Sequence, residues 1–389
     1  MDSDLLIQAA RLFRSHFGRD HAVAAYAPGR VEVLGNHTDY NEGCVLSAAI
    51  NLGTFFLAAP ADGALCRLIA GDIMEEATFD AAAPVPSAAS AWANYCKGVL
   101  AGLSGHGRGG DGFLGLFLGN LPLGAGLSSS AALEMSAAKA LCALYGIALD
   151  PIALARIGQT AEHEFAGVKC GLLDQITSLF GKEKMLVLSD FRSLAVENVP
   201  LGDGVCLLMC NTNARHALVD GAYNERRRKC EEAARFFASV LKHPVTALRD
   251  VSWAEWQEHS GRMDPLAARR AAHPIGENER VLNGRELLRQ GNLEAFGKLM
   301  FDSHRSSREY FDNSCRELDF LVDTARKVPG VLGARLSGGG FGGSAVLLVH
   351  PRDAAVIGQA MTTAYRREFG HPCDIRVVTP SAGARLVAP

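Results

Sequence analysis

The chain lacks several features that would assign it to well-known classes of protein. None of its apolar runs is long enough to cross a bilayer. Its 39 Lys and Arg residues nearly balance 42 Asp and Glu residues, which excludes the strong positive charge suited to nucleic acid or an anionic membrane surface. Residues 1–17 begin with acidic side chains and then form an amphipathic pattern, unlike a secretory signal. We therefore expect a cytoplasmic protein without nucleic-acid or membrane partners.

The cysteines also lack any recognisable pairing pattern. There are ten among 389 residues, and no Cys-x-x-Cys pair occurs, so neither a zinc site nor a thioredoxin-like redox site is indicated. Cys142 is typical, because it lies between apolar residues. We expect reduced cysteines inside the core, as is usual for proteins of the cytoplasm.

Hydrophobic periodicity predicts a mixture of helices and strands in both halves of the chain, and hence an α/β or α+β class. Internal repeats and low-complexity tracts are lacking. The Pro- and Gly-containing stretch 199–204 suggests a boundary between domains at 1–198 and 199–389. Helices are expected at 5–17, from about 92, and at 128–145, 151–166, 223–241, 276–289, 293–305 and 315–326. Strands are expected at 31–34, 46–56, 112–118, 184–188, 205–209 and 345–350.

Residues 121–132, Leu-Pro-Leu-Gly-Ala-Gly-Leu-Ser-Ser-Ser-Ala-Ala, have the properties of a phosphate-binding turn. Glycines permit a tight turn, and the N–H groups and dipole at the start of the following helix attract an anion. The segment is not a Walker A loop, because no Gly-Lys-Ser/Thr ends it. A serine that merely caps a helix after a glycine turn would give a similar pattern.

A second glycine-rich segment, Ser-Gly-Gly-Gly-Phe-Gly-Gly-Ser at 337–344, contains the spacing G-x-G-x-x-G. A nicotinamide-binding dehydrogenase is therefore one alternative. That fingerprint should open a helix, whereas residues 345–349 are typical of a strand. The glycines still indicate a backbone that passes close to a ligand or to another segment.

Residues 27–41 gather many polar side chains among turn-forming residues, as a sugar site requires. His37 and Asp39 alone would make a poor metal site, and a polar turn between strands is the alternative. Farther along, Glu162 and Asp174 stand on either side of a glycine-containing break. One carboxylate could hold Mg²⁺ and the other could act as a base, although a pair of surface acids would look the same.

In combination, these segments resemble the galactokinase family of GHMP small-molecule kinases. The resemblance is ordered along the chain and covers roughly residues 20 to 385. Its main motifs are 29–41, which is similar to the sugar signature, 124–132, similar to the ATP motif, and 333–343, similar to the third motif. Shorter similar segments occur at 92–95, 170–175, 192–194, 226–232 and 303–306.

The resemblance implies an α+β, two-lobed GHMP kinase fold. An N-terminal ribosomal-protein-like α/β lobe would bind sugar and ATP, a ferredoxin-like lobe would follow, and the active site would lie between them. It implies transfer of phosphate from ATP to the anomeric hydroxyl of D-galactose, with Mg²⁺ as cofactor, by a protein that is often monomeric.

The resemblance also implies the role of each matching residue. Asp174 would be the base, and Arg30 would stabilise the oxyanion and the transferring phosphoryl group. Mg²⁺ would be held by Ser130 and Glu162. Trp92 would lie near the adenine. The triphosphate would contact Gly124, Ala125, Gly126, Leu127, Ser128, Ser129 and Ser130. The sugar would contact Asn36, His37, Asp39, Gly171 and Tyr223.

The sequence departs from the family at three positions near the sugar signature. Asn36 replaces a glutamate that contacts the 6-hydroxyl of the sugar, Glu32 replaces an asparagine, and Ser47 replaces a proline. Asn36 is neutral, so galacturonate or a wider range of sugars is an alternative substrate. A non-catalytic galactose sensor is a further alternative, although the serines at 128–130, Asp174, Arg30 and Glu162 are all present.

Overall fold

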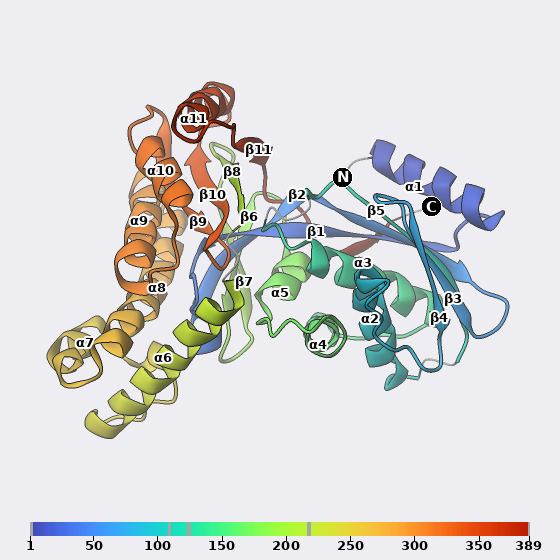
Figure 1. The fold of residues 1–389 in the computed structure, drawn as a ribbon, viewed down its shortest axis with the longest axis horizontal. Helices are drawn as coiled ribbons and strands as arrows, with labels where there is room; N and C mark the ends of the chain where they lie inside the picture. Colours follow the sequence, from blue (N-terminus) through green and yellow to red (C-terminus); the bar gives the residue numbers. More distant parts are fainter. Residues whose placement is uncertain (1–2, 108–109, 123–125, 216–218, 388–389) are drawn as a thin grey trace.

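The computed structural model describes residues 3–107, 110–122, 126–215 and 219–387 (Figure 1). The chain forms two lobes, and each lobe consists of one β-sheet with helices packed against it. Gly124 and Ala125, expected to bind ATP, lie outside the described residues. None of the described helices is long and apolar enough to cross a membrane.

The larger sheet is built around two long antiparallel strands, β1 and β2. Its order is β12-β1-β2-β5-β3-β4, with β6 pairing β2 and β7 pairing β6. Strand β3 runs parallel to β5, and the other pairings are antiparallel. The strands are β1 (Val23–Leu34), β2 (Cys44–Pro60), β3 (Leu65–Ala70), β4 (Glu75–Asp80), β5 (Phe113–Gly119), β6 (Met185–Asp190), β7 (Val196–Pro200) and β12 (Arg385–Val387).

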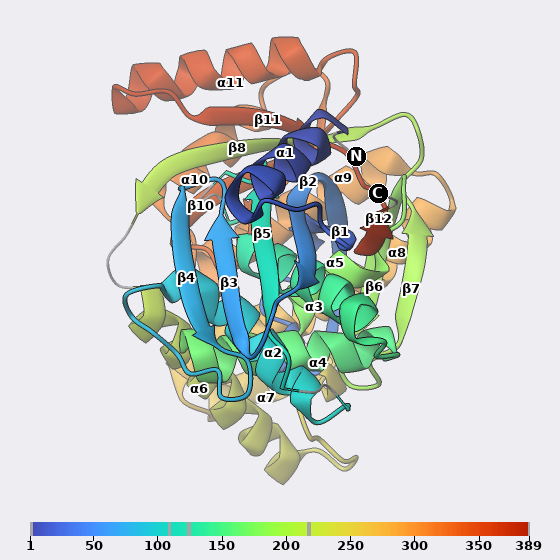
Figure 2. The same cartoon turned by 90° about the vertical axis from the view of Figure 1, so that its right-hand side faces the viewer.

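Side chains alternate between the two faces of this sheet, as the period of a strand requires. Phe56 faces a core shared with helices α2 (Asn94–Ser104), α3 (Ser129–Tyr145) and α4 (Pro151–Ala161). Its neighbours Phe55 and Leu57 face the core under α1 (Ser3–Phe17), which lies across the opposite face (Figure 2). The short helix α5 (Leu173–Phe180) follows a π-helical turn at Glu162–Ala166 and a loop.

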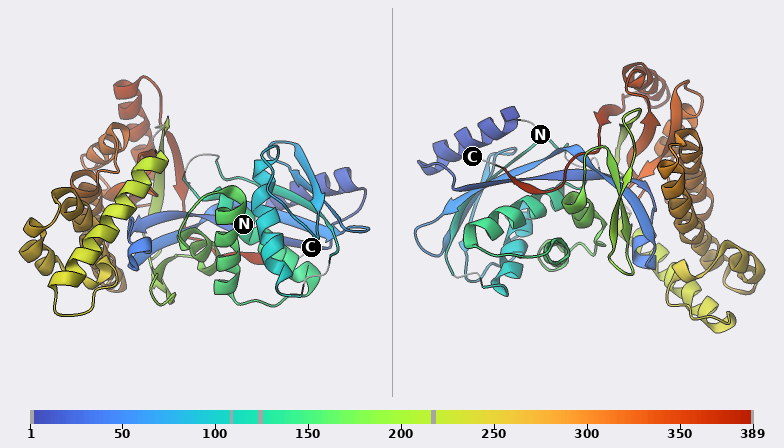
Figure 3. Two further views of the ribbon diagram at one scale, coloured as in Figure 1. Left: turned by 60° about the horizontal axis from the view of Figure 1, so that its bottom comes forward. Right: turned by 180° about the vertical axis from the view of Figure 1, so that it is seen from behind.

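The smaller sheet has the order β11-β8-β10-β9, with all neighbours antiparallel. Helices of the second half of the chain cover it, and the segment after β11 crosses back so that β12 pairs β1 (Figure 3). The strands are β8 (Cys206–Arg215), β9 (Val331–Ser337), β10 (Gly342–Val349) and β11 (Asp374–Val378). The helices are α6 (Val219–Val240), α7 (Trp253–His259), α8 (Pro265–Arg289), α9 (Leu293–Ser306), α10 (Arg316–Ala325) and α11 (Ala354–Phe369).

One hydrophobic core joins the two sheets. Leu46 of β2 and Leu186 of β6 belong to the same buried cluster as Leu207 of β8 and Val346 of β10. Phe296 of α9 completes this cluster from the second half of the chain. Because burial of apolar surface is the main stabilising term, the relative position of the two lobes is fixed by this shared core.

The expected elements are largely confirmed. Gly146 ends α3 with a positive φ of 66°, and Asp150 caps the first turn of α4. The glycines at 338–343 occupy the turn between β9 and β10 and the first residues of β10, and no helix follows them there, so the dehydrogenase alternative has no structural support. The helix expected at 151–166 is regular only to Ala161. All ten cysteines are free thiols, and eight are buried.

Helix α9 approaches strand β9 closely at Gly297. This contact predicts that even a substitution by alanine at this position lowers the stability of the fold. A Cβ atom at Gly297 would lie 2.1 Å from the carbonyl oxygen of Leu332. We expect Gly297→Ala to lower the free energy of unfolding by about 1–3 kcal/mol, because backbone must move. Gly221→Ala in α6 is the matched control, since open space surrounds that position and alanine favours helix. Equal melting temperatures for the two variants would contradict this packing.

Candidate active site

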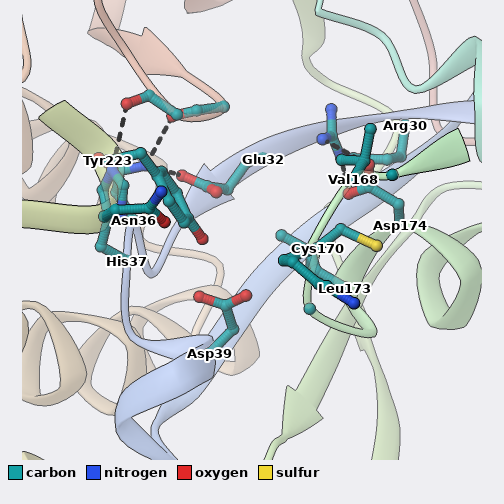
Figure 4. Close-up of a pocket in the computed structure, with 16 residues that line it drawn as sticks. Arg30, Glu32, Asn36, His37, Asp39, Val168, Cys170, Leu173, Asp174 and Tyr223 are labelled. Atoms are coloured by element: carbon teal, nitrogen blue, oxygen red, sulfur yellow. Dashed lines mark hydrogen bonds and ion pairs between the residues drawn. The ribbon is translucent and has the colours of Figure 1, made fainter. Parts of the chain in front are cut away.

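A cavity of about 550 Å³ opens between the two lobes and contains most of the expected site residues (Figure 4). Strand β1 supplies Arg30 and Glu32, which share a face because they are two residues apart. The loop after β1, the segment 167–174, helix α6 and the β9–β10 turn supply the rest. The lining residues discussed below are Arg30, Glu32, Asn36, His37, Asp39, Gly171, Asp174, Tyr223, Gly338 and Gly339.

Arg30 and Asp174 form a bidentate ion pair at one side of the cavity. Nε of Arg30 donates to Oδ1 of Asp174 at 2.7 Å, and Nη2 donates to Oδ2 at 2.9 Å. The hydroxyl of Ser128 also donates to Oδ2. A carboxylate offers about four acceptor positions, so three donors leave one position on Oδ1 for a further hydroxyl. The structure therefore holds Asp174 as an oriented acceptor that faces the cavity.

Arg30 also fixes the glycine- and serine-rich turn before α3. Its Nη1 donates to the carbonyl oxygen of Gly126 at 2.7 Å, and its backbone N–H donates to that of Leu127 at 3.0 Å. Gly29 permits this approach, because a Cβ there would lie 2.5 Å from the Leu127 oxygen. Ser128 has a φ of 55°, a conformation that is costly for a residue other than glycine and is often found at functional sites.

Ser130 and Glu162 lie next to this turn, with their side-chain oxygens close together. The Ser130 hydroxyl donates to Oε1 of Glu162 at 2.9 Å. Burial, together with the negative charge of Asp174, raises the pKa of Glu162. A divalent cation would favour the ionised form, and Mg²⁺ is commonly bound by one or two protein oxygens together with substrate phosphates. These two residues therefore fit Mg²⁺, although the described residues contain no cluster of three His, Cys, Asp or Glu side chains.

Two residues behind this pair were not predicted. The amide nitrogen of Gln175 donates to Oε2 of Glu134 at 2.9 Å and approaches Oε1 of Glu162 at 3.5 Å. Burial and the charge of Glu162 raise the pKa of Glu134 well above its usual value. Gln175 therefore connects a buried carboxyl of α3 to Glu162 and helps to set its position. Gln175 ends the family-like segment 170–175, whereas Glu134 lies beyond the motif at 124–132. Their side-chain contact could not be read from the sequence, because 41 positions separate them.

The loop after β1 holds His37 as a neutral ring. Its φ of 60° is in the left-handed region. Nε2 is 3.1 Å from the carbonyl oxygen of Gly339, so Nε2 carries the hydrogen, and Nδ1 accepts from the Tyr40 hydroxyl at 2.9 Å. Burial lowers the pKa of His37 to about 4. Both ring nitrogens are thus engaged within the protein, while the ring itself lines the cavity.

Asp39, Gly171 and Tyr223 come together on the same side of the cavity. A Cβ at Gly171 would lie 2.2 Å from Oδ2 of Asp39, so only glycine permits the present position of this carboxyl. Burial and the nearby charges of Glu32 and Asp174 raise the pKa of Asp39 to about 6. The Tyr223 ring packs 5.3 Å from that of His37 between ring centroids. The predicted sugar contacts are therefore neighbours in space.

The carboxamide of Asn36 is engaged entirely with protein groups. Nδ2 donates to Glu32 Oε1 at 2.9 Å and to the Gly338 carbonyl oxygen at 2.7 Å, while Oδ1 accepts from Asn313 Nδ2 at 2.8 Å. Glu32 in turn accepts from Nη1 of the fully buried Arg335 at 2.9 Å. Burial raises the pKa of Glu32, and the charge of Arg335 opposes this shift.

Helix α8 supports the same loop through residues that the sequence did not suggest. Oε1 of Glu277 accepts from the backbone N–H of Gly35 at 2.9 Å, and Oε2 accepts from Arg280 at 2.6 Å. Nε2 of His273 lies 3.1 Å from the carbonyl oxygen of Asn36. These contacts join positions about 240 residues apart. The orientation of the loop therefore depends on both lobes.

The remaining predicted residues lie outside the central cavity. Ser129 begins α3, and the Leu127 side chain is buried in the core shared by the two sheets. Trp92 precedes α2 and packs partly against the helical core. Its indole Nε1 is buried and has no hydrogen-bond partner among the described residues. An indole donor of this kind usually finds a partner, so a ligand acceptor would fit there.

Comparison with known proteins agrees with this geometry. The galactokinase galactose-binding signature matches residues 11–60, the GHMP kinases N terminal domain matches 94–182, and the GHMP kinases C terminal domain matches 285–367. Galactokinase of Pasteurella multocida is 38% identical over 386 residues, which cover 97% of this chain and 98% of that protein.

Solved structures show the same likeness over the whole fold. Lactococcus lactis galactokinase complexed with galactose superimposes with a TM-score of 0.92 at 32% identity, over 98% of this chain and 99% of that one. Methanococcus jannaschii mevalonate kinase has a TM-score of 0.65 at 16% identity over 93% of this chain and 98% of that one, which concerns the fold alone. With both lobes, the signature loop and the full length in agreement, this chain belongs to the galactokinase family of GHMP kinases.

Proposed function

We propose that this protein transfers the terminal phosphoryl group of ATP to the anomeric hydroxyl of D-galactose, giving galactose 1-phosphate and ADP. The observation that carries the proposal is the Arg30–Asp174 pair, which faces the cavity between the lobes beside the serine-rich turn. Phosphoryl transfer needs positioning and neutralisation of charge more than covalent help, and this arrangement supplies both.

The proton of the anomeric hydroxyl passes to Asp174. Its remaining acceptor position on Oδ1 receives the hydroxyl, and the two hydrogen bonds from the Arg30 guanidinium keep the carboxylate oriented. As the proton leaves, negative charge grows on the anomeric oxygen, which attacks the terminal phosphorus while ADP departs. Arg30 stabilises that charge from the same position, because its guanidinium is a planar, delocalised cation.

The nucleotide occupies the side of the cavity that faces α3. Backbone N–H groups at the start of a helix attract phosphate, and the residues expected to supply them are Gly124, Ala125, Gly126, Leu127, Ser128 and Ser129. Ser130 and Glu162 would hold Mg²⁺, which neutralises charge on the phosphates when bound. Trp92 would contact the adenine through its unpaired indole N–H.

The sugar is expected to contact Asn36, His37, Asp39, Gly171 and Tyr223. Glu32 and Asp39 place two carboxyl groups along the cavity, which suits the hydroxyls of a neutral sugar and opposes the carboxylate of a uronate. A neutral hexose therefore fits this cavity better than galacturonate does.

We propose the division into lobes at 1–198 and 199–389, which lies close to the end of β7 at Pro200. The ten free thiols are in keeping with a reducing compartment, the cytoplasm, where ATP is also available. We expect a monomer, as is frequent in the family to which the chain belongs.

The proposed substrate is tested by ADP release from the purified protein with ATP and Mg²⁺ over a panel of sugars. We expect galactose to give the highest kcat/KM among galactose, galacturonate, N-acetylgalactosamine, glucose and arabinose. Preference for galacturonate would overturn the argument from Glu32 and Asp39. Sugar binding without turnover of any member of the panel would instead indicate a sensor.

The proposed base is tested by Asp174→Asn, which preserves shape but removes the proton acceptor. We expect kcat to fall by about 100- to 10,000-fold. The Kd of galactose, measured by calorimetry, should stay within about tenfold of the wild-type value. Asp20→Asn is the matched control, because Asp20 is exposed, pairs only loosely with Arg14 at 3.6 Å, and does not line the cavity. Turnover near that of the control would show that Asp174 is not the base.

A further inference from the structure

The sugar cavity ends, opposite the Arg30–Asp174 pair, in a polar network centred on Glu32. Figure 4 shows Arg30 and Asp174 on one side of the cavity, with Glu32, Asn36 and His37 on the other. A sugar whose anomeric hydroxyl contacts Asp174 would direct its far hydroxyls toward this end. The groups available there decide which sugars fit.

Asn36 has little capacity left for a sugar. An amide nitrogen has two hydrogens, and those of Asn36 are donated to Glu32 Oε1 and to the carbonyl oxygen of Gly338. Its oxygen already accepts from Asn313. Only 1% of the residue is exposed. The carboxamide therefore acts as a brace between β1 and the turn that joins β9 to β10.

Glu32 has the opposite character, because one of its oxygens remains available. Oε1 accepts from Asn36 and from Arg335, whereas Oε2 accepts no hydrogen bond from the part of the chain that the structure describes. The side chain lines the cavity (Figure 4). Arg335 also approaches the Glu32 carbonyl oxygen at 3.4 Å, so the guanidinium holds this residue through two atoms. The carboxyl group is thus oriented before any sugar arrives.

Resting on the function proposed above, we propose that Glu32, rather than Asn36, is the specificity-determining residue at the far end of the sugar. Its Oε2 hydrogen-bonds a hydroxyl carried on C4 or on C6, the carbons remote from the anomeric centre. Asn36 and Arg335 are positioning residues that hold Glu32. The Asn36 amide therefore positions the loop, and the Glu32 carboxyl group contacts the substrate.

The test compares kcat/KM for galactose with kcat/KM for 4-deoxygalactose and 6-deoxygalactose, in the wild type and in Glu32→Gln. A hydrogen bond to a carboxylate is stronger than one to a neutral amide. We expect the preference of the wild type for galactose over at least one deoxy sugar to fall about tenfold in the variant. A general structural effect would lower all three rates together and leave the ratios unchanged.

Asp250→Asn is the matched control, because Asp250 is another carboxylate paired with an arginine, Arg192, but does not line the cavity. It should change kcat/KM for all three sugars by one common factor. If thermal melting shows that Glu32→Gln does not fold, the same kcat/KM ratios are measured in Glu32→Asp, which keeps a carboxylate beside Arg335. Ratios that match the wild type in each folded Glu32 variant would overturn the assignment, whereas absence of galactose turnover in the wild type would overturn the proposed function instead.

Discussion

The ion pair between Arg30 and Asp174 is the constraint on which the site depends. It joins strand β1 to helix α5, and its arginine also grips the turn before α3 through Gly126 and Leu127. These contacts hold together strand β1, helix α5 and the turn before α3. Loss of either partner would leave an uncompensated charge in a largely buried position. The same pair that organises the cavity is also the pair that the proposed reaction uses.

The second constraint is that the sugar loop is shaped by the opposite lobe. Glu277 binds the N–H of Gly35, His273 lies against the carbonyl oxygen of Asn36, and Gly339 accepts from His37. The core shared by both sheets keeps these partners in place. The proposed recognition of the sugar therefore depends on the packing between the lobes, whereas the residues proposed to bind phosphate all belong to the first lobe.

Much of the fold could be predicted because its signals are local. Gly146 and Asp150 mark helix ends by backbone conformation and capping, and residues 345–349 indicate a strand rather than a nucleotide-binding helix. Helix α5 escaped prediction because it has only eight residues and follows a glycine-containing break. The expectation that helix 151–166 is continuous was wrong beyond Ala161, where the backbone widens into a π-helical turn.

The candidate site could be predicted where its residues belong to recognisable sequence motifs. Arg30, Asp39, Gly171 and Asp174 line one cavity, as motifs far apart in the sequence suggested. The supporting residues Glu277, Asn313 and Arg335 were not predicted as contacts, because they meet the loop across about 240 to 300 positions. The engagement of the Asn36 amide with Glu32 could be seen only once both side chains were placed.

A double-mutant cycle on kcat/KM for galactose tests the central claim most directly. It compares the wild type, Arg30→Gln, Asp174→Asn and the double variant, with folding checked by circular dichroism. If the two residues act as one catalytic unit, the double variant should be about as slow as the slower single variant, since the second change removes nothing more. Losses that simply multiply would contradict the account, because they would show that Arg30 and Asp174 contribute to the reaction independently.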